Sequence, residues 1–252
     1  MIECRQLSRQ FDGLLAVDEL TLTVPGGELF GFLGPNGAGK TTSIKLMTGL
    51  LRPTGGSARI CGFDIQTQPI EARRTFGYVP DNPFLYEKLT GIEFLQFMAD
   101  LYSVDARARS ARIPELLELF ELGSKARQLI GSYSRGMRQK IAFAGALIHA
   151  PRVLFLDEPT VGLDPDGART MREVLKSLCR DGCAVFISTH ILEIAEKICN
   201  RIGIIHRGRL IALGTVAEVC CESGSLEEVF LARTGSSGQG AGLTRLETEC
   251  IS

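Results

Sequence analysis

The chain has 252 residues, of which 44% are hydrophobic, and a formal net charge of −1 at pH 7. This size predicts one large domain, or a core that carries an inserted subdomain. The balanced charge argues against the basic surface typical of nucleic-acid-binding proteins, and no apolar run approaches the ~18 residues of a membrane span. Because the first residues, MIECR, lack the apolar segment of a signal peptide, we expect a cytoplasmic protein.

The cysteines follow no metal-binding pattern: none forms a C-x-x-C pair, and no histidine stands at zinc-finger spacing. In a cytoplasmic protein we expect reduced thiols that pack as small apolar side chains. They are Cys4, Cys61, Cys179, Cys183, Cys199, Cys220, Cys221 and Cys250.

Residues 1–33 are predicted to form strands. Residues 20–24, LTLTV, alternate with period two, and the turn PGG at 25–27 precedes an apolar strand at 28–33. Phe11 lies earlier, in the short segment RQFDG. Two interpretations of its ring stay open, namely an ordinary packed aromatic or a flat surface that stacks on a nucleobase.

Residues 34–42, GPNGAGKTT, follow this strand and lead into a helix that begins near Lys40. Strand, glycine-rich loop and helix are the context in which G-x-x-x-x-G-K-[ST] binds phosphate. Glycines permit the backbone angles that turn successive amides toward an anion, and the helix N-terminus adds its dipole. Lys40 supplies a full positive charge, and the Thr41 hydroxyl is a suitable Mg²⁺ ligand. The predicted nucleotide-binding residues of this loop are Gly34, Pro35, Asn36, Gly37, Ala38, Gly39, Lys40, Thr41 and Thr42.

Beyond the strands at 57–61 and 75–79, helical spacing dominates. Segments 89–102, 106–122 and 135–149 each have it, and Ser134 is a candidate N-cap of the last one. We therefore predict an all-helical insertion at about 81–150. In its second helix one face would carry the apolar residues Ile113, Leu116, Leu117 and Phe120.

The alternation of strands and helices then resumes. Buried strands are predicted at 152–156 and 184–187, and Asp164 and Pro165 mark the start of the helix between them. A strand pair is expected over 201–213. Residues 235–252 are rich in glycine and serine and are predicted to be a disordered tail.

Polar residues follow both strands of this second half. Asp157 and Glu158 come directly after the first, at the sheet edge where open α/β folds place ligands. Asp157 suits a metal-holding carboxylate, and Glu158 suits a general base that polarises water. His190 follows the second strand and is a candidate donor to a γ-phosphate.

The motifs together resemble the nucleotide-binding subunit of an ATP-binding cassette (ABC) transporter, over about residues 1–234. They occur in the family's order: Walker A (34–42), YSRGMR at the signature position (133–138), Walker B (154–159), the D-loop GLDP (162–165) and the H-loop STH (188–190). The resemblance implies an α/β fold, namely a P-loop NTPase (RecA-like) core at about 1–80 and 151–234, with an N-terminal antiparallel β-subdomain and the helical insertion at 81–150.

The resemblance also implies residue roles. Phe11 would stack on adenine, Asp81 would occupy the Q-loop position as a metal ligand, Glu158 would be the base and His190 would sense the γ-phosphate. Ser134 and Gly136 would contact ATP held by a second subunit, in a homodimer or a pair with a paralogue. ATP and Mg²⁺ are the implied cofactors. The implied partner is a polytopic membrane permease, which would hold the chain on the cytoplasmic face of the inner membrane. The chain itself most resembles the single-cassette bacterial exporter type, and import stays open as the alternative.

Two departures from the family pattern matter. At the signature, Arg135 replaces the first glycine of LSGGQ and Met137 replaces the glutamine, while Ser134 and Gly136 are kept. At the Q-loop, the glutamine is replaced by Asp81, followed by Asn82, and either side chain is a candidate for its role.

Two competing functions remain. A soluble ABC ATPase that acts on ribosomes or nucleic acid would favour a basic surface and usually carries two cassettes or a long coiled coil. A P-loop GTPase should carry an N-K-x-D-type segment, and we find none.

Overall fold

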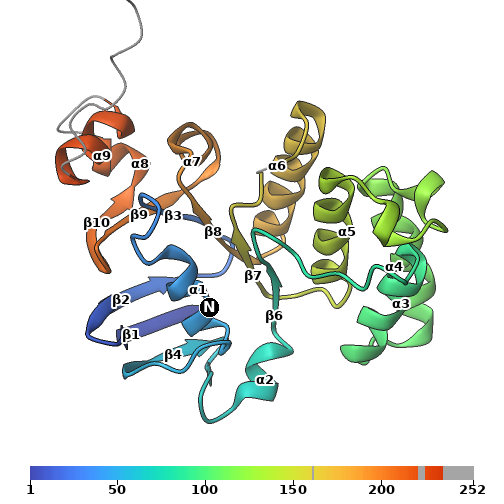
Figure 1. Ribbon diagram of the computed structural model, residues 1–252, viewed down its shortest axis with the longest axis horizontal. Helices are drawn as coiled ribbons and strands as arrows, with labels where there is room; N and C mark the ends of the chain where they lie inside the picture. The colour runs from blue at the N-terminus through green and yellow to red at the C-terminus, as the bar shows by residue number, and fades with distance from the viewer. Residues whose placement is uncertain (161, 221–224, 235–252) are drawn as a thin grey trace, which may run out of the picture.

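The computed structural model describes residues 1–160, 162–220 and 225–234 (Figure 1). The tail predicted at 235–252, together with Cys221 and Cys250, lies outside the described residues. Two sheets with helices around them form the described part of the chain (Figure 1).

The first sheet is antiparallel and comes from the N-terminal part of the chain. Strand β1 pairs with both β2 and β4, and the turn between β1 and β2 contains Asp12 and Gly13, whose φ angles are 40° and 90°. Two left-handed residues are typical of a tight hairpin turn. In sheet order the strands are β2 (Leu14–Val24), β1 (Ile2–Phe11), β4 (Gly55–Ile60) and β5 (Phe63–Asp64).

The second sheet is parallel except for β10, which runs antiparallel to β9. Since β3 lies between β8 and β9, and β7 lies beside β8, the carboxyl ends of strands from distant parts of the chain meet at one edge. In sheet order the strands are β10 (Arg209–Thr215), β9 (Arg201–His206), β3 (Leu29–Leu33), β8 (Ala184–Thr189), β7 (Val153–Asp157) and β6 (Phe76–Val79).

The helices begin where the sequence supplies caps. Thr90 and Glu93 form a capping box at α3, and Asp105 and Asp164 accept hydrogen bonds from the first turns of α4 and α6. The helices are α1 (Lys40–Met47), α2 (Pro69–Arg73), α3 (Gly91–Leu101), α4 (Ala106–Leu119), α5 (Arg135–Leu147), α6 (Pro165–Arg180), α7 (Leu192–Ile198), α8 (Val216–Cys220) and α9 (Leu226–Thr234). The short helices α2 and α8 were not predicted, because five residues show too little of a helical period.

Both faces of the parallel sheet are buried, which explains why its strands are continuous apolar runs. Phe30, Phe32 and Phe186 point to one face, where α1 and the antiparallel sheet pack. Leu154 and Val185 point to the other face, toward α5 and α6. The core therefore fixes the strands on both sides and leaves their carboxyl ends free to form a site.

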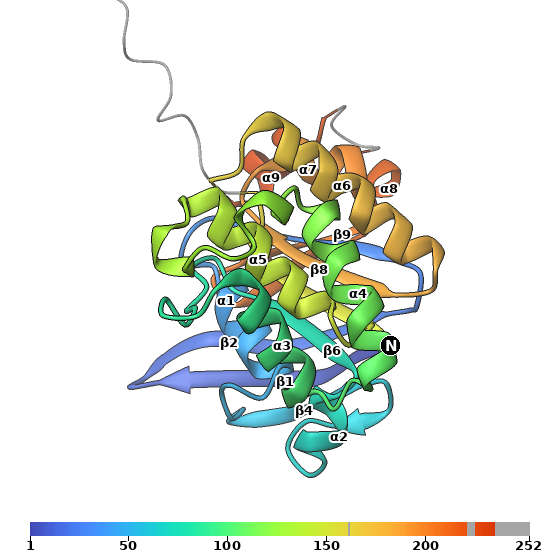
Figure 2. The ribbon, with the colours of Figure 1, turned by 90° about the vertical axis from the view of Figure 1, so that its right-hand side faces the viewer.

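Helices α3, α4 and α5 lie between β6 and β7 in the chain, and they stand together beside the sheet in Figures 1 and 2. The predicted apolar face of α4 is confirmed, since all four of its residues are buried. The last of them, Phe120, lies just beyond the helix, which ends at Leu119 rather than at 122. None of the helices in the described ranges combines the length with the apolar composition of a membrane span.

Candidate nucleotide site

Residues 34–39 connect β3 to α1, and two of their glycines are required by close backbone approach. A Cβ atom on Gly39 would lie 2.5 Å from the carbonyl oxygen of Ala16, and one on Gly34 would lie 2.5 Å from that of Ile205. Gly39 also has a φ of 111°. Only glycine fits such positions, so the loop can pass between β2 and β9 and present its amides in front of α1.

A cavity of about 230 Å³ lies in front of this loop. All the predicted loop residues except Gly34 and Ala38 line it. Ala38 is buried behind the loop, and the carbonyl of Gly34 accepts a hydrogen bond from Lys40. The lining residues are Ala16, Pro35, Asn36, Gly37, Gly39, Lys40, Thr41, Thr42, Asp81 and Glu158.

The ammonium group of Lys40 is buried and held by the loop itself. It donates to the carbonyl oxygens of Gly34 and Pro35 at 2.7 and 3.3 Å, and lies 3.6 Å from Glu158 Oε1. Burial lowers the pKa of Lys40, and the nearby carboxylates of Glu158 and Asp157 oppose that shift. The cation is therefore fixed at the cavity rather than free in solvent.

Asp157 ends β7 and is buried, and two hydroxyl groups donate to its carboxylate. Thr41 donates to Oδ2 at 2.8 Å, and Ser188, its neighbour in the register of β8, donates to Oδ1. Adjacent ligands on an octahedral Mg²⁺ ion stand roughly 3 Å apart, because each Mg–O distance is about 2.1 Å. The hard oxygens of Thr41 and Asp157 therefore fit a magnesium ion at the cavity.

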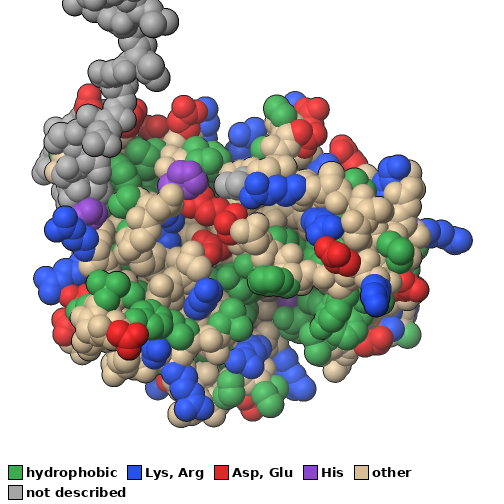
Figure 3. Space-filling model, viewed as in Figure 1, with side chains coloured by type: hydrophobic (Ala, Val, Ile, Leu, Met, Phe, Trp, Pro, Cys, Tyr) green, Lys and Arg blue, Asp and Glu red, His purple; other side chains and the backbone are tan. Residues whose placement is uncertain are grey.

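Glu158 stands at the mouth of the cavity with its carboxylate held on both oxygens. His190 Nδ1 lies 2.8 Å from Oε1, and the hydroxyl of Thr189 donates to Oε2 at 3.0 Å. The backbone of Glu158 has a φ of 49°, a left-handed value that a glutamate rarely adopts and that is common at functional sites. Figure 3 shows red carboxylate side chains beside a purple histidine in the upper left part of this face. A carboxylate so placed can take a proton from a water molecule at the cavity.

Two further predictions concern the rim of the site. Phe11 ends β1 with 39% of its surface exposed, so it is not a core aromatic, and it does not line the loop cavity.

Asp81 lines the cavity and Asn82 does not. One oxygen of Asp81 accepts a hydrogen bond from Asn82 at 3.4 Å, and the other is buried with no hydrogen bond in the described part of the chain. The geometry therefore favours Asp81 for the Q-loop position.

The predicted signature residues lie elsewhere. Ser134 caps α5 by accepting a hydrogen bond from the amide of Met137 at 3.3 Å, and Gly136 lies against the carbonyl of Gly162. Neither residue lines the loop cavity. The structure thus does not bring the signature to the phosphate loop of its own chain.

Sequence reasoning missed three contributors to the site, namely Ala16, Ser188 and Thr189. Ser188 and Thr189 belong to the STH motif and end a strand beside Asp157 and Glu158, so their position was a usable signal. The sequence gives no signal for Ala16, because only the shape of the β1–β2 hairpin places it at the cavity.

Residues 17–161 match the family model of the ABC transporter. The chain belongs to the ABC transporter family. It is 46% identical over 201 residues to an uncharacterised ABC transporter ATP-binding protein of Nostoc, which covers 79% of this chain and 59% of that protein. It is 40% identical over 225 residues to the daunorubicin/doxorubicin resistance ATP-binding protein DrrA of Streptomyces peucetius, which covers 89% of this chain and 68% of DrrA.

Solved structures agree with this membership. An ATP-binding subunit of an ABC transporter superposes with a TM-score of 0.89 at 34% identity, over 93% of this chain and 99% of that one. A dimeric bacterial ABC transporter cassette, MJ0796, superposes with a TM-score of 0.78 at 25% identity, over 85% of this chain and 98% of that one. The predicted P-loop NTPase fold is confirmed, and the chain is an ABC-type ATPase cassette.

Proposed function

We propose that this cassette binds ATP with Mg²⁺, closes on it with a second cassette, and hydrolyses it to drive a separate membrane-spanning subunit. One observation carries the hydrolytic part: Glu158 is fixed between Lys40 and His190 at the mouth of the loop cavity, beside the Thr41–Asp157 pair. A positive charge for phosphate, hard oxygens for a metal and a base for water are thus gathered within one site.

Each residue has a distinct task in this proposal. The loop amides and Lys40 bind the β- and γ-phosphates, and Thr41 and Asp157 hold Mg²⁺, with Asp81 as a further oxygen ligand. The ion, when bound, neutralises charge on the phosphate oxygens. Glu158 accepts a proton from the attacking water. When both ring nitrogens of His190 carry a proton, Nδ1 orients the Glu158 carboxylate and Nε2 donates to the γ-phosphate. Phe11 receives the adenine ring.

A second copy, or a paralogous cassette, would complete the site. Ser134 and Gly136 lie outside the cavity of their own chain, at a helix N-terminus suited to an anion. In related phosphotransfer enzymes, a group supplied in trans raises the rate by ~10³–10⁵. We therefore expect weak ATPase activity in a monomer, and activity per molecule that falls on dilution. Activity that stays constant over a wide dilution series would contradict the dimer.

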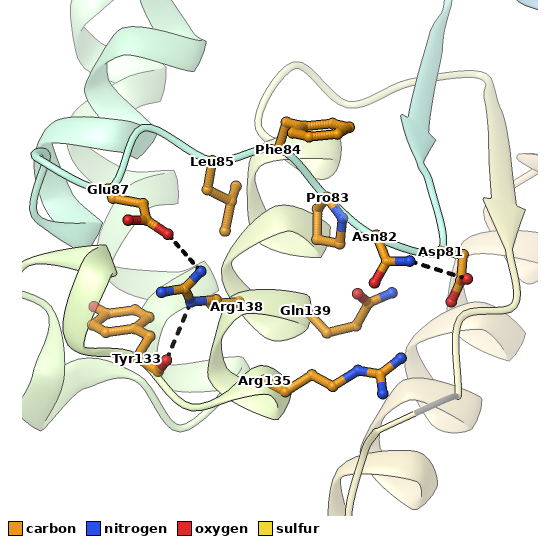
Figure 4. Close-up of a pocket in the computed structure, with 10 residues that line it drawn as sticks. All are labelled: Asp81, Asn82, Pro83, Phe84, Leu85, Glu87, Tyr133, Arg135, Arg138 and Gln139. Carbon is orange, nitrogen blue, oxygen red and sulfur yellow. Dashed lines mark hydrogen bonds and ion pairs between the residues drawn. The ribbon is translucent and has the colours of Figure 1, made fainter.

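The membrane partner would dock on the helical side, for which we propose residues 81–150 as a subdomain. A cavity of about 730 Å³ separates the loop after β6 from α5 (Figure 4). In its wall, Arg138 is paired with Glu87 at 2.7 Å. Beside it Phe84 is fully exposed and Tyr86 is 58% exposed. Exposed aromatics next to a cavity are typical of an interaction site.

We further propose transport in the export direction, through a polytopic permease that holds the cassette at the cytoplasmic face of the inner membrane. A 40% identity over 226 residues to a Nod factor export ATP-binding protein of Burkholderia pseudomallei, covering 88% of this chain and 74% of that protein, supports this direction. Phe84→Ala should leave basal ATPase activity and stability unchanged and should weaken co-purification with the permease. Equal recovery of the permease with Phe84→Ala would contradict docking at this cavity.

The Glu158→Gln variant tests the proposed chemistry. It keeps the size of the side chain and removes the base, so it should retain ATP, accumulate as a dimer with Mg-ATP and lose turnover by ~10²–10⁴. The dimer is measured by size-exclusion chromatography with light scattering, and turnover by phosphate release. Normal turnover in this variant would remove Glu158 from the mechanism.

A further inference from the structure

Arg9 and Phe11 lie two residues apart on β1 and therefore on the same face of the strand. The guanidinium carbon of Arg9 lies 4.5 Å from the centroid of the Phe11 ring, well within the ~6 Å of a cation–π contact. The Phe11 residue is still 39% exposed. One side of the ring is therefore occupied by a cation, and surface remains for a second stacking partner.

Arg9 is itself anchored. Its Nη1 donates to the carbonyl oxygen of Arg52 at 2.9 Å, in the segment that leaves α1. The amide of Thr54 in this segment donates to the carbonyl of Ser8 at 2.8 Å, which holds the segment against β1. The guanidinium thus connects the ring to the chain that leaves the helix behind the phosphate loop.

The turn at Asp12 and Gly13 fixes the backbone of Phe11, but it does not fix the ring, which stands at the end of a hairpin. An exposed ring that must be ordered on binding loses part of its stacking free energy, and a ring already held loses less. Stacking of a base on an aromatic side chain contributes ~1–3 kcal/mol. Holding the ring is therefore useful only if something stacks on it.

We propose that Arg9 is a positioning residue of the nucleotide site, which holds the Phe11 ring so that the base of ATP stacks on its opposite face. Guanidinium, phenyl ring and purine would form three layers. This inference rests on the proposed function, in which Phe11 receives the base. Arg9 does not line the loop cavity, so it acts through the ring and not on the phosphates.

The test compares ATP with inorganic tripolyphosphate, which has the charge and lacks the base. Binding of each, with Mg²⁺, is measured by titration calorimetry for the wild-type chain and Arg9→Met. We expect Arg9→Met to weaken ATP binding roughly three- to ten-fold and to leave tripolyphosphate binding unchanged. An equal loss for both ligands, or no loss for ATP, would overturn the inference.

Three further variants separate positioning from folding. Arg9→Lys keeps the charge without the planar group and should recover only part of the affinity. In a Phe11→Leu background, Arg9→Met should have no further effect on ATP; a persistent effect would show that Arg9 does not act through the ring. Arg5→Met, on the same strand and paired with Glu3, is the matched control and should bind like wild type.

The wild-type chain also separates this inference from the proposed function. If it binds tripolyphosphate and ATP equally well, the base does not stack; the inference and the proposed role of Phe11 then fail, while triphosphate binding and hydrolysis by the cassette stand. If it binds neither ligand, both fail.

Discussion

Lys40 Nζ lies 3.6 Å from Glu158 Oε1, so the cation of the phosphate loop is paired with the carboxylate that follows β7. Both side chains are largely buried, so separating the ammonium group from the carboxylate costs free energy unless each finds a new partner. A triphosphate that takes Lys40 must compete with Glu158. Release of the carboxylate from Lys40 and the approach of phosphate are therefore coupled.

This pairing predicts that Glu158→Gln binds Mg-ATP more tightly than wild type. The amide cannot compete for Lys40 as the carboxylate does, and an ion pair worth about 1 kcal/mol corresponds to about a five-fold lower Kd. Fluorescent-nucleotide titration measures this Kd, and Glu193→Gln, which removes a surface acid paired with Lys197, is the control.

The Lys40→Ala variant should bind Mg-ATP at least ten-fold more weakly than wild type. Unchanged affinity in this variant would count against the phosphate loop assignment.

The contact between Thr41 and Asp157 predicts a magnesium dependence. Thr41→Val removes an oxygen ligand and the hydrogen bond to Asp157, so the Mg²⁺ concentration needed for half-maximal ATP binding should rise about ten-fold. Thr41→Ser keeps the hydroxyl and is the matched control. If Thr41→Val and Thr41→Ser need the same Mg²⁺ concentration for half-maximal ATP binding, the hydroxyl is not a ligand of the metal.

His149 predicts how stability depends on pH. Its Nε2 hydrogen bonds to the carbonyl of Phe76 at 3.1 Å, its ring stacks on Tyr102, and burial lowers its pKa from 6.5 to about 4. Because the unfolded chain takes up the proton first, stability is complete above pH 6.5 and is lost as pH falls toward 4, by at most about 3 kcal/mol.

Chemical denaturation at pH values between 4 and 7.5 measures this loss. The His149→Gln variant has no ionisable group at this position, so its stability should fall less over the same range. Parallel curves for variant and wild type would assign the acid sensitivity to other residues.

Gly77 predicts a packing limit between β6 and α5. A Cβ atom at this position would lie 2.4 Å from the carbonyl oxygen of Ala146, which is backbone and cannot rotate away. Gly77→Ala should lower the free energy of unfolding by about 2 kcal/mol or more. A Cβ atom on Gly123 would have no atom within 4 Å, so Gly123→Ala should change the free energy of unfolding by less than about 0.5 kcal/mol. Equal denaturation midpoints for the two variants would contradict the close contact.

The sequence by itself determined the local elements and the chemistry they carry. Period-two alternation predicted the strand at 20–24, and continuous apolar runs predicted the buried strands. Asp164 and Pro165 predicted the start of α6, and the glycine spacing predicted the loop in front of Lys40. These features depend on neighbours within a few residues, so they can be read along the chain. The same reasoning placed Asp157 and Glu158 correctly at the end of a buried strand.

Only the tertiary structure decided which of these groups meet. The lateral order β3-β8-β7 brings Thr41 to Asp157 and His190 to Glu158, and it leaves Ser134 outside the cavity. It also decided that Asp81 rather than Asn82 lines the cavity, and that Phe11 is an exposed residue whose ring contacts the guanidinium of Arg9. The physical reason is that strand order and the packing of sheet on helix arise from long-range burial, which no local pattern of residues specifies.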